Sequence, residues 1–147
     1  MTTTPQDFTA RWQRAAPQLR SVLRIIAAFL FIQYGAIKLF GFPKPMPPGV
    51  SLPVFSQLWF AGALEVFGGG FLLIGLCTRP VAFLLAGEMA VAYFQGHASR
   101  GFWPIVNGGT DAIFFGFLWL YFSAAGAGSW SLDAMMAKAW PGTRRSR

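Results

Sequence analysis

Four apolar stretches of nearly membrane-spanning length constrain the fold of this chain more than any other feature. They cover residues 21–40, 57–76, 81–95 and 110–125. A helix needs about 20 residues to cross a hydrocarbon core of about 30 Å, so the last two stretches must extend into their flanks. The sequence therefore predicts an all-α polytopic membrane protein, a bundle of four transmembrane helices.

Composition agrees with lipid as the surrounding solvent. Of the 147 residues, 54% are hydrophobic and 12% are charged, whereas soluble domains carry roughly 25% charged residues. The net charge of +7 comes from residues in the tails and at the edges of the apolar stretches. The sequence has no basic stripe along a soluble helix, the usual mark of nucleic-acid binding. We therefore expect the lipid bilayer as a partner, and no nucleic acid.

Lysine and arginine divide unequally between the two sides that four spans would create. The side with Lys38, Lys44 and Arg100 has three. The side with both tails and the second loop has nine: Arg11, Arg14, Arg20, Arg24, Arg79, Lys138, Arg144, Arg145 and Arg147. Because positive residues accumulate on the cytoplasmic side, we predict that both termini are cytoplasmic; in a Gram-negative host the membrane is then the cell inner (cytoplasmic) membrane. The loops 41–56 and 96–109 then face outward.

The chain divides into three parts on this interpretation. Residues 1–19 are a cytoplasmic N-terminal segment, in which residues 6–16 have the pattern of a short amphipathic helix, with a disordered tail as the alternative. Residues 20–135 form the four-helix membrane domain. Residues 136–147 are a basic cytoplasmic tail. We thus expect short amphipathic segments at both ends of the bundle.

A single cysteine, Cys77, and a single histidine, His97, restrict the cofactors that this chain could hold. One cysteine excludes an intrachain disulfide, a CxxC redox pair and an iron–sulfur cluster. One histidine excludes a bis-histidine haem within the chain, and no spacing motif supports a metal site. We predict no metal and no intrinsic cofactor. A redox cofactor would be diffusible, such as a quinone, or carried by a partner.

Each predicted helix carries one ionisable residue in its outer half, namely Lys38, Glu65, Glu88 and Asp111. Inserting such a group into a bilayer costs about 2.5–3.5 kcal/mol. At 1.5 Å per residue, Glu65 lies about 18 Å and Glu88 about 14 Å from the inner ends of their helices. Tyr34, four residues before Lys38, shares its helix face. The four groups therefore lie at comparable depth and can meet.

Two interpretations of these residues stay open. In the structural one, Lys38 pairs with Asp111 or Glu65 and fixes the order of the helices. In the functional one, three carboxylates handle protons in a cavity that opens outward, and desolvation keeps at least one glutamate protonated near neutral pH. These candidate catalytic residues are Glu65, Glu88 and Asp111. The candidate ligand-binding residues are Lys38, Tyr34, His97, Arg100 and Asn107.

Two of these candidates also have simpler interpretations. His97 alone is more often an interfacial hydrogen-bonding residue than a metal ligand. Asn107 begins the sequence Asn-Gly-Gly, which most simply supplies the turn and the cap before the fourth helix. For Asn107 we prefer the structural interpretation.

Four separated segments resemble the DoxX family of small bacterial membrane proteins. They are GAIKLFGFP at 35–43, the glycine-rich segment 62–94, GHASRGFWPIVNGGTD at 96–111 and SWSLD at 129–133. The resemblance covers roughly residues 20–135. Family members carry Tyr-Glu after Asn-Gly-Gly, whereas this chain has Thr110-Asp111, so the carboxylate is kept on a shorter side chain.

The resemblance implies a four-helix membrane fold and, more loosely, a redox function. Some relatives are membrane subunits associated with a thiosulfate:quinone oxidoreductase, and others belong to membrane complexes that handle thiols and oxidative stress. We thus expect a membrane subunit of a quinone- or thiol/sulfur-linked complex; if it is an enzyme, it is a quinone-linked oxidoreductase subunit. The alternative is a non-catalytic assembly or scaffold subunit, bound to a membrane protein partner or to its own copies through faces rich in Gly and Ala.

Overall fold

The computed structural model describes residues 5–46, 49 and 52–139, and this part of the chain is helical without strands. The all-α class is therefore confirmed for the described residues. The elements in chain order are α1 (Pro5–Phe40), α2 (Gln57–Ile74), α3 (Thr78–Gly96), the 3-10 helix η1 (Ala98–Arg100), α4 (Pro104–Asn107), α5 (Thr110–Ala125) and α6 (Leu132–Ala139). The four predicted apolar stretches correspond to α1, α2, α3 and α5. The basic tail beyond residue 139 lies outside the described residues.

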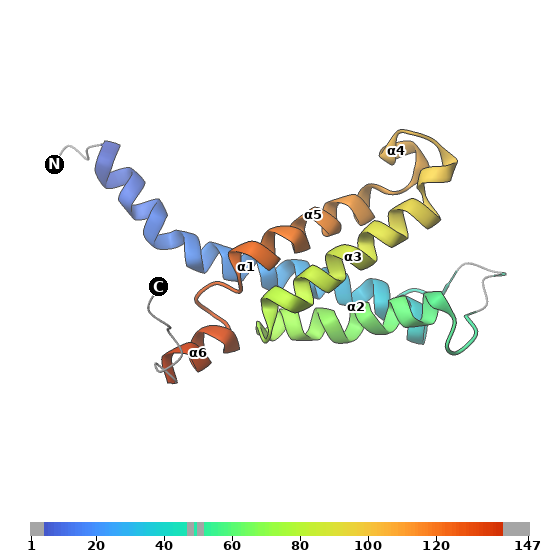
Figure 1. Cartoon of the computed structure of the whole chain (residues 1–147), viewed down its shortest axis with the longest axis horizontal. Helices are drawn as coiled ribbons and strands as arrows, with labels where there is room; N and C mark the ends of the chain where they lie inside the picture. Colours follow the sequence, from blue (N-terminus) through green and yellow to red (C-terminus); the bar gives the residue numbers. More distant parts are fainter. Residues whose placement is uncertain (1–4, 47–48, 50–51, 140–147) are drawn as a thin grey trace.

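Helix α1 is longer than the apolar stretch that it contains. It starts at Pro5, and a proline suits the first turn because its missing N–H would have no partner there. Residues 6–16 are thus helical and continuous with the apolar part. Pro17 lies inside the helix, where it removes one backbone hydrogen bond and favours a kink. Figure 1 shows α1 bent between its N-terminal arm and the rest.

The turn between α2 and α3 follows from two unusual backbone conformations. Gly75 ends α2 with a φ of 69°, and its N–H donates to the carbonyl of Leu72, as in a common helix C-cap. Cys77 also has positive φ, at 49°, and α3 starts directly after it. The third helix therefore begins at Thr78, three residues before the predicted stretch at 81–95. Pro80 lies in its first turn, where proline is tolerated.

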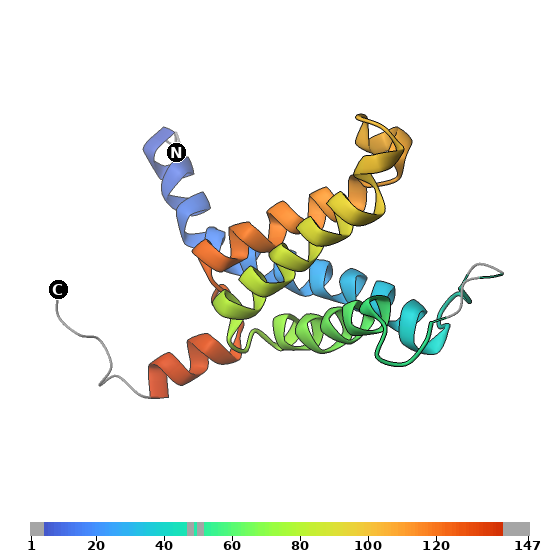
Figure 2. The same ribbon diagram turned by 45° about the vertical axis from the view of Figure 1, so that its right-hand side comes forward.

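The helices form two antiparallel pairs. Helix α1 packs along α2, and α3 packs along α5, whereas the contacts between the pairs are fewer. Figures 1 and 2 show the pairs close together where α2 and α5 end and separating toward the loops 41–56 and 96–109. We call the first end the clasp end and the second the loop end. Aromatic side chains fill the contact between pairs, with Phe31 and Trp119 5.2 Å apart between ring centroids.

Arg24 joins four backbone carbonyls at the clasp end. Its side chain is fully buried. It donates to the carbonyl of Leu72, to that of Leu73 at 2.8 Å, to that of Ala127 at 2.9 Å and to that of Trp130 at 2.6 Å. The last carbonyls of a helix have no partner within the helix. Arg24 therefore satisfies the end of α2 and ties it to α1 and to the segment after α5.

Three further side chains complete this clasp. Arg20 donates to the carbonyl of Ala125 at 2.5 Å, and Arg79 donates to that of Ala124 at 2.6 Å, both at the end of α5. Asp133 accepts hydrogen bonds from the backbone N–H groups at the start of α3, that of Cys77 at 2.8 Å and that of Thr78 at 2.9 Å. Cations at helix C-termini and anions at N-termini are both favourable. We refer to Arg20, Arg24, Arg79 and Asp133 as the Arg24 clasp.

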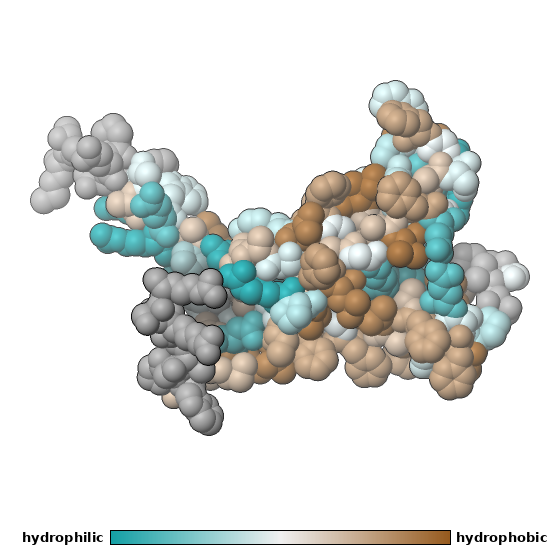
Figure 3. All heavy atoms as spheres, viewed as in Figure 1, coloured by the Kyte–Doolittle hydropathy of each residue, from teal (hydrophilic) through white to brown (hydrophobic). Residues whose placement is uncertain are grey.

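Two described helices are long and apolar enough to cross a membrane by length and composition, over Thr9–Phe40 and Gln57–Ile74. Helix α5 is apolar but has 16 residues. Helix α3 carries Arg79 and Glu88, which lower its hydropathy. On the face drawn in Figure 3, hydrophobic residues cover much of the four long helices, and hydrophilic residues gather on the N-terminal arm of α1.

Candidate functional site

Lys38 and Glu65 form an ion pair between α1 and α2. The Lys38 ammonium lies 2.5 Å from each carboxylate oxygen of Glu65, and Glu65 is only 2% exposed. The two helices approach closely at Gly62, where a Cβ atom would lie 2.9 Å from that of Lys38. Small residues permit such close packing of membrane helices. Of the two predicted partners of Lys38, Glu65 is therefore the one that it binds.

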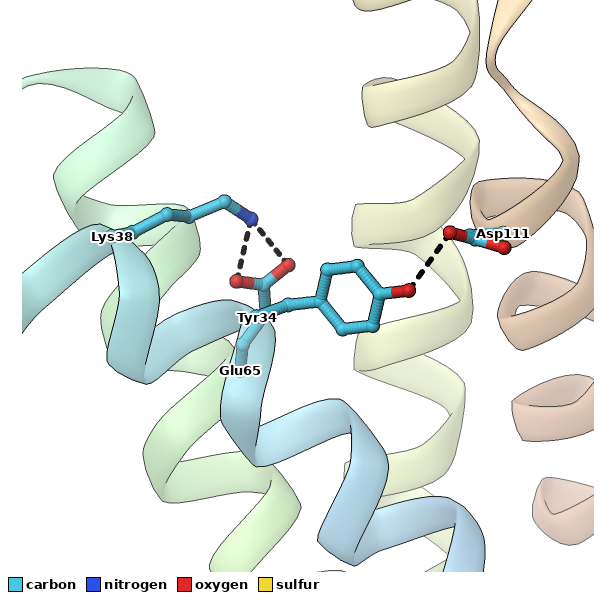
Figure 4. A network of polar contacts seen from close by, with 4 residues as sticks. All are labelled: Tyr34, Lys38, Glu65 and Asp111. Atoms are coloured by element: carbon cyan, nitrogen blue, oxygen red, sulfur yellow. Dashed lines mark hydrogen bonds and ion pairs between the residues drawn. The ribbon is translucent and has the colours of Figure 1, made fainter. Parts of the chain in front are cut away.

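Asp111 binds Tyr34 instead. The Tyr34 hydroxyl donates to Oδ2 of Asp111 at 2.8 Å, which joins α1 to α5. Figure 4 shows the two contacts side by side, with Tyr34 between the ion pair and Asp111. Asp111 lies in the first turn of α5, where the helix dipole favours an anion. Four of the eight candidate residues thus come together at one level.

Glu88, on α3, lies within electrostatic range of the ion pair but makes no hydrogen bond with any described residue. Both of its carboxyl oxygens are buried, and the charges of Glu65 and Lys38 act on it. A buried polar group without a partner is costly, and structures rarely keep one without a reason. We refer to Tyr34, Lys38, Glu65, Glu88 and Asp111 as the polar network. It contains more carboxylates than cations.

A pocket of about 450 Å³ lies beside the network between α1 and α5. Tyr34, Asp111 and Gln33 give it a polar end. The remaining walls are apolar and come from Leu30, Ile37, Phe114 and Phe115. Of the three predicted carboxylates, Asp111 lines this pocket, whereas Glu65 and Glu88 are not among its lining residues.

The other three candidates belong to the loop 96–109. Nδ1 of His97 lies 3.2 Å from the carbonyl oxygen of Asn107. Asn107 is buried; its amide donates to the carbonyl of Gly101 at 2.8 Å and accepts from the N–H of Gly109 at 2.8 Å. Asn107 thus organises the turn before α5, which agrees with the simpler interpretation. Arg100 is exposed in η1. These contacts stabilise the loop and do not reach the ion pair.

Sequence reasoning missed two parts of this arrangement. The first part is the lining of the pocket by Gln33, Phe114 and Phe115. The sequence offered one indication of it, a glutamine next to Tyr34 in an apolar stretch. The second part is the hydrogen bond between Gln57 and Gln95, at 2.6 Å, which joins α2 to α3 near the loop end.

Among the described residues, no group of three or more His, Cys, Asp or Glu side chains is placed to hold a metal ion.

We expect Lys38 and Glu65 to be energetically coupled. Lys38→Met leaves a buried carboxylate unpaired and should lower stability by about 3–5 kcal/mol. Adding Glu65→Gln should recover much of that loss, because neither position of the pair then carries a charge. Thermal unfolding in one detergent of the two single variants and the double variant measures the coupling. Lys44→Met removes an exposed lysine and is the control. Strictly additive losses would show that the pair does not organise the network.

Comparisons with known proteins agree with the family resemblance noted in the sequence. The DoxX family model matches residues 19–98. A protein of Haemophilus influenzae described as uncharacterized is 41% identical over 124 residues, which cover 82% of this chain and 92% of that protein. No solved structure matches the chain. The chain belongs to the DoxX family, a family of membrane proteins.

Proposed function

We propose that α1, α2, α3 and α5 all cross the inner (cytoplasmic) membrane of a bacterium, with both termini in the cytoplasm. The uneven distribution of Lys and Arg supports this orientation. The Arg24 clasp supports it further, because Arg20, Arg24 and Arg79 gather at the end where α2 and α5 finish. The clasp end then faces the cytoplasm, and the loop end faces outward.

We further propose that the protein is the quinone-binding membrane subunit of a redox complex. The observation that carries this proposal is the pocket between α1 and α5, with apolar walls and the pair Tyr34–Asp111 at its polar end. Ligand sites are typically apolar clefts with a few placed polar groups. A quinone ring matches that description, since it is flat, stacks on aromatic side chains such as Phe114 and Phe115, and accepts hydrogen bonds at its carbonyls.

The polar network supplies the proton chemistry in this proposal. Reducing a quinone to a quinol takes two electrons and two protons. The electrons come from a partner protein that oxidises a thiol or another reduced sulfur compound. The two protons come from the surrounding water, and the Tyr34 hydroxyl and the Asp111 carboxyl group pass them to the two quinone oxygens. Glu88 holds a further proton, because an ionised carboxylate without a partner is expensive inside a membrane.

One observation favours the second candidate function, a non-catalytic assembly subunit. An apolar groove of about 460 Å³ lies between α3 and α5, and small residues such as Ala86, Ala90 and Gly116 form part of its lining. Such a surface suits close packing of a further membrane helix. A chain that co-purifies with a larger membrane complex and binds no quinone would have this function and would contradict the redox proposal.

The proposed topology predicts how cysteines react in intact cells. Native Cys77 is exposed at the clasp end and should react with a membrane-impermeant maleimide only after the cells are permeabilised. Ser99→Cys, in a Cys77→Ser background, places a thiol at an exposed position of the outer loop and should react in intact cells. Mass spectrometry of the labelled protein gives both results. The reverse pattern of labelling would overturn the orientation.

The proposed quinone site predicts a specific loss of affinity. In lipid nanodiscs, Tyr34→Phe and Asp111→Asn should each weaken the binding of a short-chain quinone about tenfold. Losing one hydrogen bond costs about 1.4 kcal/mol of binding free energy, which corresponds to a tenfold change in affinity. Tyr121→Phe makes the same chemical change at an exposed position near the other end of α5 and should leave the affinity unchanged. Equal affinities in all variants, or no saturable binding, would rule out this pocket.

A further inference from the structure

Four strongly exposed apolar side chains project from the loop between α3 and α5. Phe102 and Ile105 are each 82% exposed, and Trp103 and Val106 are exposed as well. They belong to one run of five residues, in which Pro104 is the fifth. A contiguous apolar surface of this kind on a structured element marks a site of contact with a membrane or another protein.

The run is held in a defined shape by its own hydrogen bonds. The N–H groups of Val106 and Asn107 both donate to the carbonyl of Trp103 at 2.9 Å, and that of Gly109 donates to the carbonyl of Pro104 at 3.0 Å. Buried Asn107 closes the turn through its bonds to Gly101 and Gly109. Asn107 is therefore a positioning residue, and the exposure of its apolar neighbours is built into the loop.

The composition of the loop fits a lipid surface. Arg100 is exposed directly before the apolar run, and residues 96–109 contain no Asp or Glu. Tryptophan is enriched at membrane interfaces, and arginine binds lipid phosphate through charge-assisted hydrogen bonds. Further exposed aromatic side chains, such as Phe94 and Phe117, lie on α3 and α5, the two helices that this loop joins. Figure 3 shows hydrophobic residues on one side of this loop and hydrophilic residues on the other.

We propose that residues 102–106 form an interfacial anchor that dips into the leaflet at the loop end, with Arg100 at the level of the lipid phosphates. The anchor fixes the loop end of the α3–α5 pair to the membrane surface, whereas the Arg24 clasp holds the opposite end to α1 and α2. It rests on neither the quinone proposal nor the identity of a partner. The proposed topology decides only that the leaflet is the outer one.

Spin labels measure the depth of this loop. In a Cys77→Ser background, nitroxides are attached to Ile105→Cys and, as a control in the same loop, to Ser99→Cys. The protein is reconstituted into vesicles of phosphatidylcholine and phosphatidylglycerol. Collision rates with oxygen, which concentrates in lipid, and with a water-soluble nickel chelate are then compared. We expect the oxygen-to-nickel ratio to be severalfold higher at position 105 than at position 99.

Two outcomes would overturn the anchor. Equal ratios at positions 105 and 99 would place the apolar run in water. Low collision rates with both reagents at position 105 would show that protein covers it.

Asn107→Ala tests the positioning role separately, because a loosened turn should lower the oxygen-to-nickel ratio at position 105 while leaving the ratio at position 99 unchanged. Arg100→Gln should lower the ratio at position 105 as well, because a glutamine side chain cannot form a charge-assisted hydrogen bond with the lipid phosphates.

Discussion

The buried guanidinium of Arg24 is the interaction on which the rest of the structure depends. A charge in a membrane protein is tolerated only when it is fully satisfied, and Arg24 meets this condition with four backbone carbonyls and not with a bound carboxylate. The negative end of the α2 dipole supplies much of the compensation. Asp133, which also accepts hydrogen bonds from the N–H groups at the start of α3, places a favourable negative charge near Arg24. One side chain thus connects α1, α2 and the C-terminal segment.

The polar network lies in the half of the protein opposite the Arg24 clasp. The helix pairs are fixed together at the clasp end and separate toward the loop end (Figure 2). Between them, the hydrogen bonds Tyr34–Asp111 and Gln57–Gln95 are side-chain contacts that join one pair to the other near the loops. The pocket beside Tyr34 occupies this region. A ligand there would compete with the Tyr34–Asp111 bond, and binding would be coupled to the contact between the pairs.

The sequence predicted those features that follow from the cost of charge in lipid. Lys38 and Glu65 could be expected to meet because neither is stable alone at that depth. The sequence did not predict the role of Arg24. The positive-inside rule assigns such a residue to one side of the membrane, but it does not identify a hydrogen-bond partner. For the arm before residue 21, the sequence left a short amphipathic helix over residues 6–16 and a disordered tail as alternatives, and the structure has the helix; α4 is too short to produce a pattern of its own. Gln33 could not be assigned to a pocket, since that depends on how α1 lies against α5.

The central proposal is that the buried carboxyl group of Glu88 stays protonated within the polar network that borders the proposed quinone pocket. Infrared spectroscopy of the protein in lipid vesicles at neutral pH tests it directly. We predict a protonated-carboxyl stretching band that disappears in Glu88→Gln, persists in Asp111→Asn and shifts when a quinone is added. A spectrum in which Glu88→Gln removes only an ionised-carboxylate band, with no response to quinone, would contradict the claim.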